Sequence, residues 1–124
     1  MSTVDEIRPF APDELRGRRA LVTGSSRGIG ADTVAYLAGA GADVVVNYRN
    51  KAARAEKLVA KLMEGGTKAV AVGADLTDPA SVDALMETIR AELGGLDVLV
   101  LNASGGMESG MAEDYALKIG RAHV

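Results

Sequence analysis

The chain has 124 residues, of which 48% are hydrophobic and 25% charged, a composition typical of one folded domain and far from that of a disordered protein. Its formal net charge of −3 gives no electrostatic reason to expect a nucleic-acid partner, and we interpret Arg16, Arg18 and Arg19 as the solvated start of a strand. The lack of cysteine excludes disulfides and thiolate metal sites, and one histidine, His123, poorly supplies zinc binding or histidine-based catalysis.

The N-terminal residues 1–10 are acidic and mixed in polarity, unlike a signal peptide. No apolar run in the sequence approaches the roughly 20 residues that a membrane helix needs. We therefore expect a cytoplasmic protein without membrane contacts.

The first predicted strand covers residues 19–23 and ends in a glycine-rich turn. Apolar residues then recur at helical spacing from Ile29 to Ala40, and Gly41 ends this helix. Residues 43–47 form an apolar, β-branched run, which is typical of a parallel strand covered on both faces.

A second helical stripe runs over residues 55–63 and is closed by Gly65, after which residues 68–72 predict a third strand. Asp78 is a good N-cap for a third helix because Pro79 follows it at the first helical position. That helix keeps one apolar face until Gly94, and residues 96–101 predict a fourth strand.

This alternation predicts an α/β fold, a Rossmann-like doubly wound parallel sheet that is truncated after the fourth strand. The connections between successive parallel strands are right-handed, so the helices are expected on both faces of the sheet. No linker or internal repeat divides the chain further.

The glycine-rich turn over residues 23–30 reads TGSSRGIG and lies between the first strand and the first helix. Gly24 can take a positive φ in the tight turn, Gly28 lets the backbone approach a pyrophosphate, and Gly30 permits close packing of the helix. The anion would then meet N–H groups at the helix N-terminus. A plain turn is the alternative, but this spacing in this context favours phosphate binding.

The pattern Thr-Gly-x-x-x-Gly-x-Gly resembles the cofactor motif of classical short-chain dehydrogenases/reductases, and the resemblance covers residues 18–114. It implies the cofactor-binding half of an oxidoreductase that transfers a hydride between NADP(H) and an alcohol or carbonyl substrate, in a parent protein that forms a homo-oligomer. The loop residues expected to contact the cofactor are Gly24, Ser26, Arg27, Gly28, Ile29 and Gly30.

The residue at the end of the second strand determines whether NAD or NADP is preferred. An acidic residue there binds the ribose hydroxyls of NAD, and a basic one accommodates the 2′-phosphate of NADP. Here the sequence is Asn47-Tyr48-Arg49, with no carboxylate. Arg49 and Arg27 could flank a phosphate, so NADP is favoured. NAD or dual use stays open, as does a plain solvated role for Arg49.

Two further segments resemble family motifs. Asp75 and Leu76 match the pair that holds the adenine edge, although an aspartate after a strand also suits a turn. Asn102 and Ala103 match part of the Asn-Asn-Ala-Gly motif beside the nicotinamide ribose, with Ser104 inserted before the glycine.

The resemblance implies catalysis by a tyrosine with a lysine four residues later, and this pair is absent. The residues four positions after the three tyrosines are Ala40, Ala52 and Ile119. We therefore expect no catalytic residue in this chain and place the chemistry in a part of the parent protein that follows it.

Residues 118–124 resemble a translated sequencing adapter, so we assign residues 1–117 to the cofactor-binding domain and 118–124 to a non-native tail; a genuine helical continuation is the alternative.

Two other functions remain as hypotheses. The chain could be a non-catalytic dinucleotide-binding module, or an S-adenosylmethionine methyltransferase, whose usual acidic residue at the second strand is replaced here by Tyr48-Arg49.

Overall fold

The computed structural model describes residues 9–102, so Ala103 and the predicted tail at 118–124 lie outside the described residues. Strands and helices alternate throughout, in the order β1 (Arg19–Val22), α1 (Gly28–Gly39), β2 (Asp43–Tyr48), α2 (Ala52–Glu64), β3 (Ala69–Gly73), α3 (Pro79–Leu93) and β4 (Val98–Val100). None of these described helices has the length and apolarity needed to cross a lipid bilayer.

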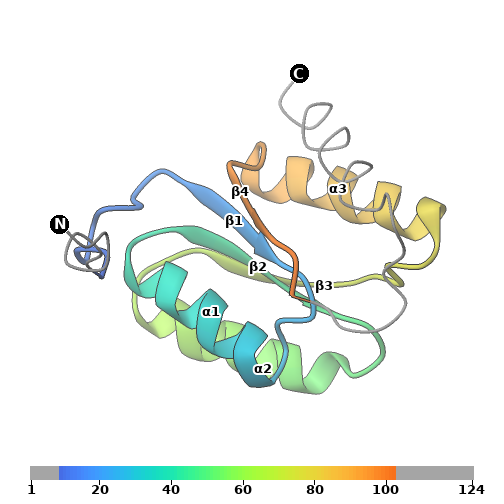
Figure 1. Ribbon diagram of the computed structural model, residues 1–124, viewed down its shortest axis with the longest axis horizontal. Helices are drawn as coiled ribbons and strands as arrows, with labels where there is room; N and C mark the ends of the chain where they lie inside the picture. Colours follow the sequence, from blue (N-terminus) through green and yellow to red (C-terminus); the bar gives the residue numbers. More distant parts are fainter. Residues whose placement is uncertain (1–8, 103–124) are drawn as a thin grey trace, which may run out of the picture.

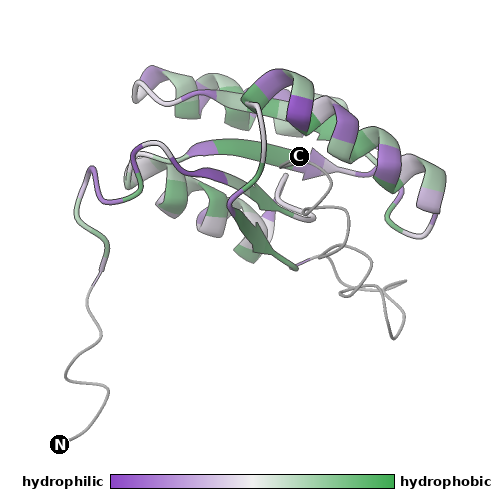
Figure 2. Ribbon diagram, turned by 90° about the horizontal axis from the view of Figure 1, so that it is seen from above, coloured by the Kyte–Doolittle hydropathy of each residue, from purple (hydrophilic) through white to green (hydrophobic). Residues whose placement is uncertain are grey.

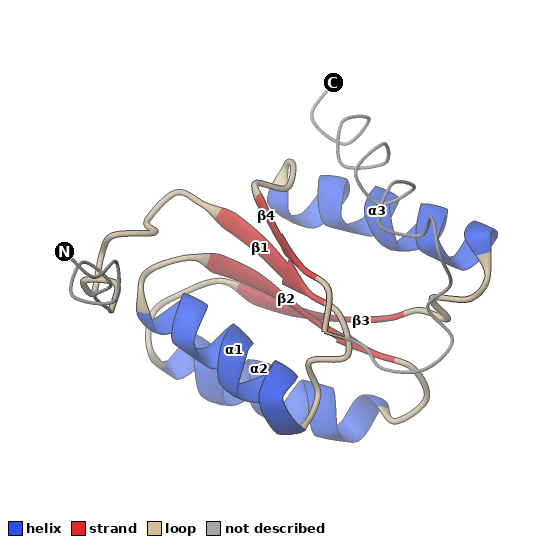
Figure 3. Cartoon of the chain, viewed as in Figure 1, coloured by secondary structure: helices blue, strands red, loops and turns tan. Residues whose placement is uncertain are grey.

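The four strands form one parallel sheet in the order β3-β2-β1-β4. Helices α1 and α2 cover one face of the sheet and α3 covers the other, which gives three layers (Figure 1; Figure 3). The predicted α/β fold, a Rossmann-like doubly wound parallel sheet, is confirmed by this arrangement.

Alternate side chains of the central strands belong to two separate cores. Ala20 and Val22 of β1 pack with α1 and α2, whereas Leu21 between them packs with α3. In β2, Val44 and Val45 divide in the same way. Both faces of these strands are buried, which accounts for their unbroken apolar runs at residues 20–22 and 44–46. Figure 2 shows these runs in green, while the helices alternate green and purple.

The predicted element boundaries are right to within a few residues. The fourth strand, predicted over residues 96–101, is shorter in the structure and covers Val98–Val100. Leu96 lies outside the strand and is fully buried in the core with α3. Asp78 caps α3 as predicted, accepting a 3.1 Å hydrogen bond from Ala80 N–H, and Gly94 ends that helix with φ of +84°.

Arg19 begins β1 as predicted and its side chain stays partly exposed, but it also forms an ion pair that the sequence did not indicate. Its guanidinium donates to both carboxylate oxygens of Asp97, at 2.9 and 3.1 Å, and its backbone N–H donates to the same carboxylate at 2.9 Å. A Cβ at Gly95 would lie 2.7 Å from the guanidinium, so a side chain there would displace the end of Arg19 from its present position. This bidentate pair joins the starts of β1 and β4.

We expect Leu21→Ala to lower the free energy of unfolding by about 2 to 5 kcal/mol, because it leaves a cavity between the central strand and α3. Urea unfolding of the full chain followed by circular dichroism measures this change. Met63→Ala is the control, since Met63 is 54% exposed and its loss should change stability by less than about 0.5 kcal/mol. Equal effects of the two substitutions would contradict the two-core description.

Candidate functional site

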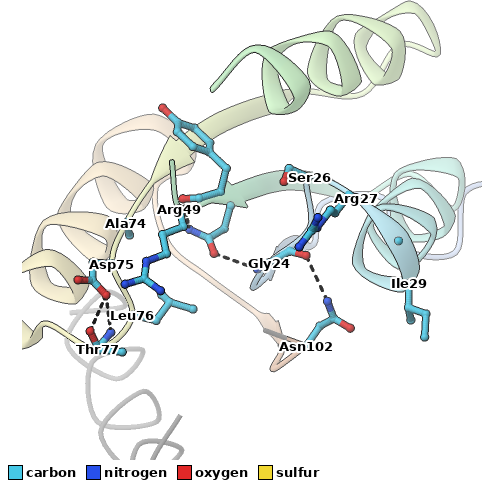
Figure 4. Close-up of a pocket in the computed structure, with 13 residues that line it drawn as sticks. Gly24, Ser26, Arg27, Ile29, Arg49, Ala74, Asp75, Leu76, Thr77 and Asn102 are labelled. Carbon is cyan, nitrogen blue, oxygen red and sulfur yellow. Dashed lines mark hydrogen bonds between the residues drawn. The ribbon is translucent and has the colours of Figure 1, made fainter. Parts of the chain in front are cut away.

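A cavity of about 580 Å³ opens at the carboxyl ends of the strands, where the connections to the helices begin. This is the edge at which parallel α/β sheets bind ligands. Nine of the predicted site residues line it: Gly24, Ser26, Arg27, Gly28, Ile29, Arg49, Asp75, Leu76 and Asn102. The structure therefore brings together segments that are far apart in the sequence (Figure 4).

The glycine-rich loop takes the backbone shape that its sequence predicts. Gly24 and Gly28 have φ of +60° and +61°, the left-handed region that glycine adopts without strain. A Cβ at Gly28 would meet nothing within 4 Å, so the backbone there borders open space that a ligand can approach.

Gly30 does not line the cavity, yet the site depends on its lack of a side chain. A Cβ there would lie 2.5 Å from both the carboxamide nitrogen of Asn102 and the carbonyl oxygen of Gly24. The close packing predicted at Gly30 is thus present, but it is made with the loop and with Asn102, two residues after β4. Only glycine lets α1 start directly above the strand ends.

The N-terminus of α1 is open to an anion. The first-turn N–H groups have no intrahelical acceptors, and within the described residues no side chain caps this helix. By contrast, Asp78 caps α3. Helix α2 also starts without a side-chain cap, but its N-cap Lys51 does not line the cavity. The α1 end is distinguished by its place in the cavity wall beside Arg27.

Asn102 ties the end of β4 to the glycine-rich loop. Its backbone N–H donates to the hydroxyl of Thr23 at 2.9 Å, and its carboxamide nitrogen donates to the carbonyl oxygen of Gly24 at 3.2 Å (Figure 4). Part of its hydrogen-bonding capacity therefore holds the loop in place, which the family resemblance alone did not predict.

Asp75 and Arg49 form the other side of the cavity, and Figure 4 shows the Arg49 side chain extending toward Asp75 and Leu76. The Asp75 carboxylate accepts hydrogen bonds from the hydroxyl and backbone N–H of Thr77, at 2.6 and 3.0 Å. These bonds, with the nearby charge of Arg49, lower the pKa of Asp75 below its usual range. Asp75 therefore shapes a turn and also brings an ionised acceptor to the cavity.

Four lining residues are missing from the predicted set, namely Asn47, Tyr48, Ala74 and Thr77. Asn47 had a signal in the sequence, because a polar residue inside an apolar strand must find hydrogen-bond partners. Thr77 had one too, since a threonine two residues after an aspartate favours a local turn. Tyr48 packs its ring over Gly73, where a Cβ would lie 2.8 Å from it, and no local pattern indicates that contact.

The family model described as short chain dehydrogenase matches residues 18–120 of the chain. Among curated proteins, the chain is 47% identical over 93 residues to the short chain dehydrogenase/reductase AacuN of Aspergillus aculeatus, covering 75% of the chain and 35% of that protein. It is 42% identical over 103 residues to the versicolorin reductase stcU of Emericella nidulans, covering 83% and 37%. The chain thus spans less than half the length of these relatives.

Solved structures give the same picture. A short chain dehydrogenase from Burkholderia cenocepacia in complex with NADP superposes with a TM-score of 0.73 at 35% identity, covering 88% of this chain and 50% of that one. The L-sorbose reductase of Gluconobacter frateurii, complexed with NADPH and L-sorbose, superposes with a TM-score of 0.80 at 26% identity, covering 88% and 48%.

We expect Gly30→Ala to destabilise the chain by about 1 to 3 kcal/mol, because its methyl group overlaps Asn102 and the Gly24 carbonyl. Gly39→Ala is a matched control in the same helix, since a Cβ there meets nothing within 4 Å. It should stabilise by up to about 1 kcal/mol. Urea unfolding measures both, and a stabilised Gly30→Ala variant would contradict the close approach.

We expect Thr77→Val to raise the pKa of Asp75 toward its usual value, because the larger of its two hydrogen-bond causes is removed while the backbone bond remains. A lowered pKa in the folded state contributes stability above the unfolded pKa and loses it as pH falls through the folded one. Titration of the Asp75 carboxyl carbon by NMR measures the shift. Thr33→Val, which removes a hydroxyl bond within α1, should leave that titration unchanged.

Proposed function

Because the chain belongs to the short chain dehydrogenase family, we propose that its cavity binds NADP and that the whole protein transfers a hydride between NADP(H) and an alcohol or carbonyl substrate. The observation that carries this proposal is the meeting of the glycine-rich loop, the open N-terminus of α1 and the side chains of Arg27, Arg49 and Asp75 around one cavity. The NADP and NADPH complexes of its structural relatives support it.

Each part of the cavity suits a different part of the cofactor. The N–H groups at the start of α1 would bind the pyrophosphate, which they attract through hydrogen bonds and the helix dipole. Asp75 offers an acceptor to the adenine amino group, with Leu76 as an apolar neighbour. Ile29, Asn102 and Ala103 would border the nicotinamide half, which supplies the hydride when it is bound. Ile29 is 76% exposed and offers an apolar surface for this contact.

The choice of NADP over NAD follows from charge. Arg27 and Arg49 both line the cavity, and the end of β2 carries no carboxylate that would bind two ribose hydroxyls. Guanidinium groups form paired hydrogen bonds with phosphate oxygens, which makes them the favoured partners of a 2′-phosphate.

The proton-transfer step would belong to residues of a longer protein. No tyrosine in this sequence has a lysine four residues later, so the chain contributes cofactor binding and we assign it no catalytic residue. We infer that residues 1–117 form part of the cofactor domain and that residues 118–124 are a non-native tail. Sequencing the source DNA across the codon for Leu117 tests this inference, and native codons that encode the present residues 118–124 and carry on in frame would overturn it.

We infer further that the whole protein is a cytoplasmic homo-oligomer. Size-exclusion chromatography of the full-length protein with light scattering tests the assembly, and a monomer would overturn it. The rival function, a dinucleotide-binding module without chemistry, predicts that the full-length protein binds NADPH and reduces no carbonyl compound.

We expect the chain to bind NADPH more tightly than NADH, and Arg49→Ala and Arg27→Ala each to weaken NADPH binding by about 10- to 100-fold, because each removes a charge-assisted hydrogen bond. NADH binding should change much less. Isothermal titration calorimetry measures both affinities on the full 124-residue chain.

Arg54→Ala, on the exposed surface of α2 and outside the cavity, is the control for loss of a positive charge. It should leave both affinities unchanged. Equal losses for NADPH and NADH in Arg49→Ala would contradict a 2′-phosphate contact, and no binding of either cofactor by the unaltered chain would contradict the proposed function.

A further inference from the structure

Asn47 is a buried polar residue whose function the cofactor motifs do not assign. It is the penultimate residue of β2 and follows three fully buried valines. It is only 2% exposed, so its carboxamide is almost completely removed from water. A polar group in that position destabilises the fold unless all of its donors and acceptors find partners.

One set of partners lies in the glycine-rich loop. The carboxamide oxygen of Asn47 accepts a hydrogen bond from the backbone N–H of Gly24 at 2.9 Å. Its backbone N–H donates to the hydroxyl of Ser25 at 2.9 Å, and its carbonyl oxygen accepts from the N–H of Ser25 at 2.9 Å. The hydroxyl of Ser25 is thereby turned inward, and Ser25 is fully buried. Three hydrogen bonds from Asn47 to Gly24 and Ser25 therefore fix the first half of the loop.

The other partners lie near the end of β3 and at the last residue of β2. The carboxamide nitrogen of Asn47 donates to the carbonyl oxygen of Val72 at 3.2 Å and lies 3.4 Å from that of Tyr48. Val72 is close in sequence to Asp75, on the adenine side of the cavity. One flat carboxamide thus links the phosphate side of the site to the adenine side.

We propose that Asn47 is a positioning residue that holds the glycine-rich loop in its binding shape before the cofactor arrives. The proposal rests on the proposed function for the identity of the ligand. Gly24 and Gly28 give the loop many alternative backbone conformations, and ordering such a segment upon binding would lower the affinity. The bonds of Asn47 remove that cost in the unliganded protein.

The first test needs no ligand. Asn47→Leu keeps nearly the same volume and removes every side-chain hydrogen bond, whereas Asn47→Ala also removes the volume. In both variants of the full chain we expect the Gly24 amide to exchange its hydrogen at least about 10-fold faster, the equivalent of about 1.4 kcal/mol, while amides in the centre of β1 keep their protection. NMR-detected hydrogen exchange measures both sets.

Thr88→Val is the matched control, because it removes a hydrogen bond to the Ala84 carbonyl on α3, away from the loop. Gly24 should exchange at the unaltered rate in this variant. If Asn47→Leu does not fold, Asn47→Ser replaces it in the test. The serine hydroxyl at this position is too short to bond to both Gly24 and Val72, so the link between them is still lost. Unchanged exchange at Gly24 in a folded Asn47 variant would overturn the proposal.

The second test uses cofactor binding. Asn47→Leu and Asn47→Ala should weaken the binding of NADPH and of NADH by the same factor, about 10-fold. The ratio of the two affinities should not change, because in the proposed complex Arg27 and Arg49 set it and both are unaltered. If the unaltered chain binds neither cofactor, the proposed function fails while the exchange result stands. If it binds NADPH and Asn47→Leu binds it as tightly, the positioning role fails and the proposed function stands.

Discussion

The site depends on one steric constraint, the absence of a side chain at Gly30. A Cβ there would lie 2.5 Å from the Gly24 carbonyl and the Asn102 carboxamide, so any larger residue would push α1 away from the loop. Because α1 starts this close to the sheet, its uncapped N-terminus forms one wall of the cavity. The same closeness brings the glycine-rich loop within reach of side chains from both neighbouring strands.

Two asparagines bind the glycine-rich loop, one from β2 and one that follows β4, the two strands that flank β1. Asn47 accepts from the N–H of Gly24, and Asn102 donates to its carbonyl oxygen. The backbone N–H and carbonyl groups of Gly24 therefore both have hydrogen-bond partners within the protein. The N–H groups that begin α1 remain for a ligand. The start of the glycine-rich loop is therefore held by hydrogen bonds, while its end, at the N-terminus of α1, stays accessible to an anion.

Features encoded locally could be predicted from the sequence, and those that depend on strand order could not. The apolar run of β2, the glycine spacing and the Asp78 cap each lie within a few residues, so their patterns are complete in themselves. The pairing of Arg19 with Asp97 joins residues that meet only because β4 lies beside β1. Similarly, Asn47 looked like part of a cofactor-selecting segment, whereas its carboxamide turns inward to the loop.

The position of a carboxylate, and not its presence, bears on cofactor choice. Asp75 lies in the cavity, but after β3, and Thr77 holds one of its oxygens in a turn. The charged lining residues Arg27, Arg49 and Asp75 leave one net positive charge in a chain whose net charge is −3. Because Asp75 offsets one arginine, the attraction to a 2′-phosphate rests on having a second one. Arg27 supplies that charge from within the loop, so in the proposed complex the segment that binds the pyrophosphate also selects the cofactor.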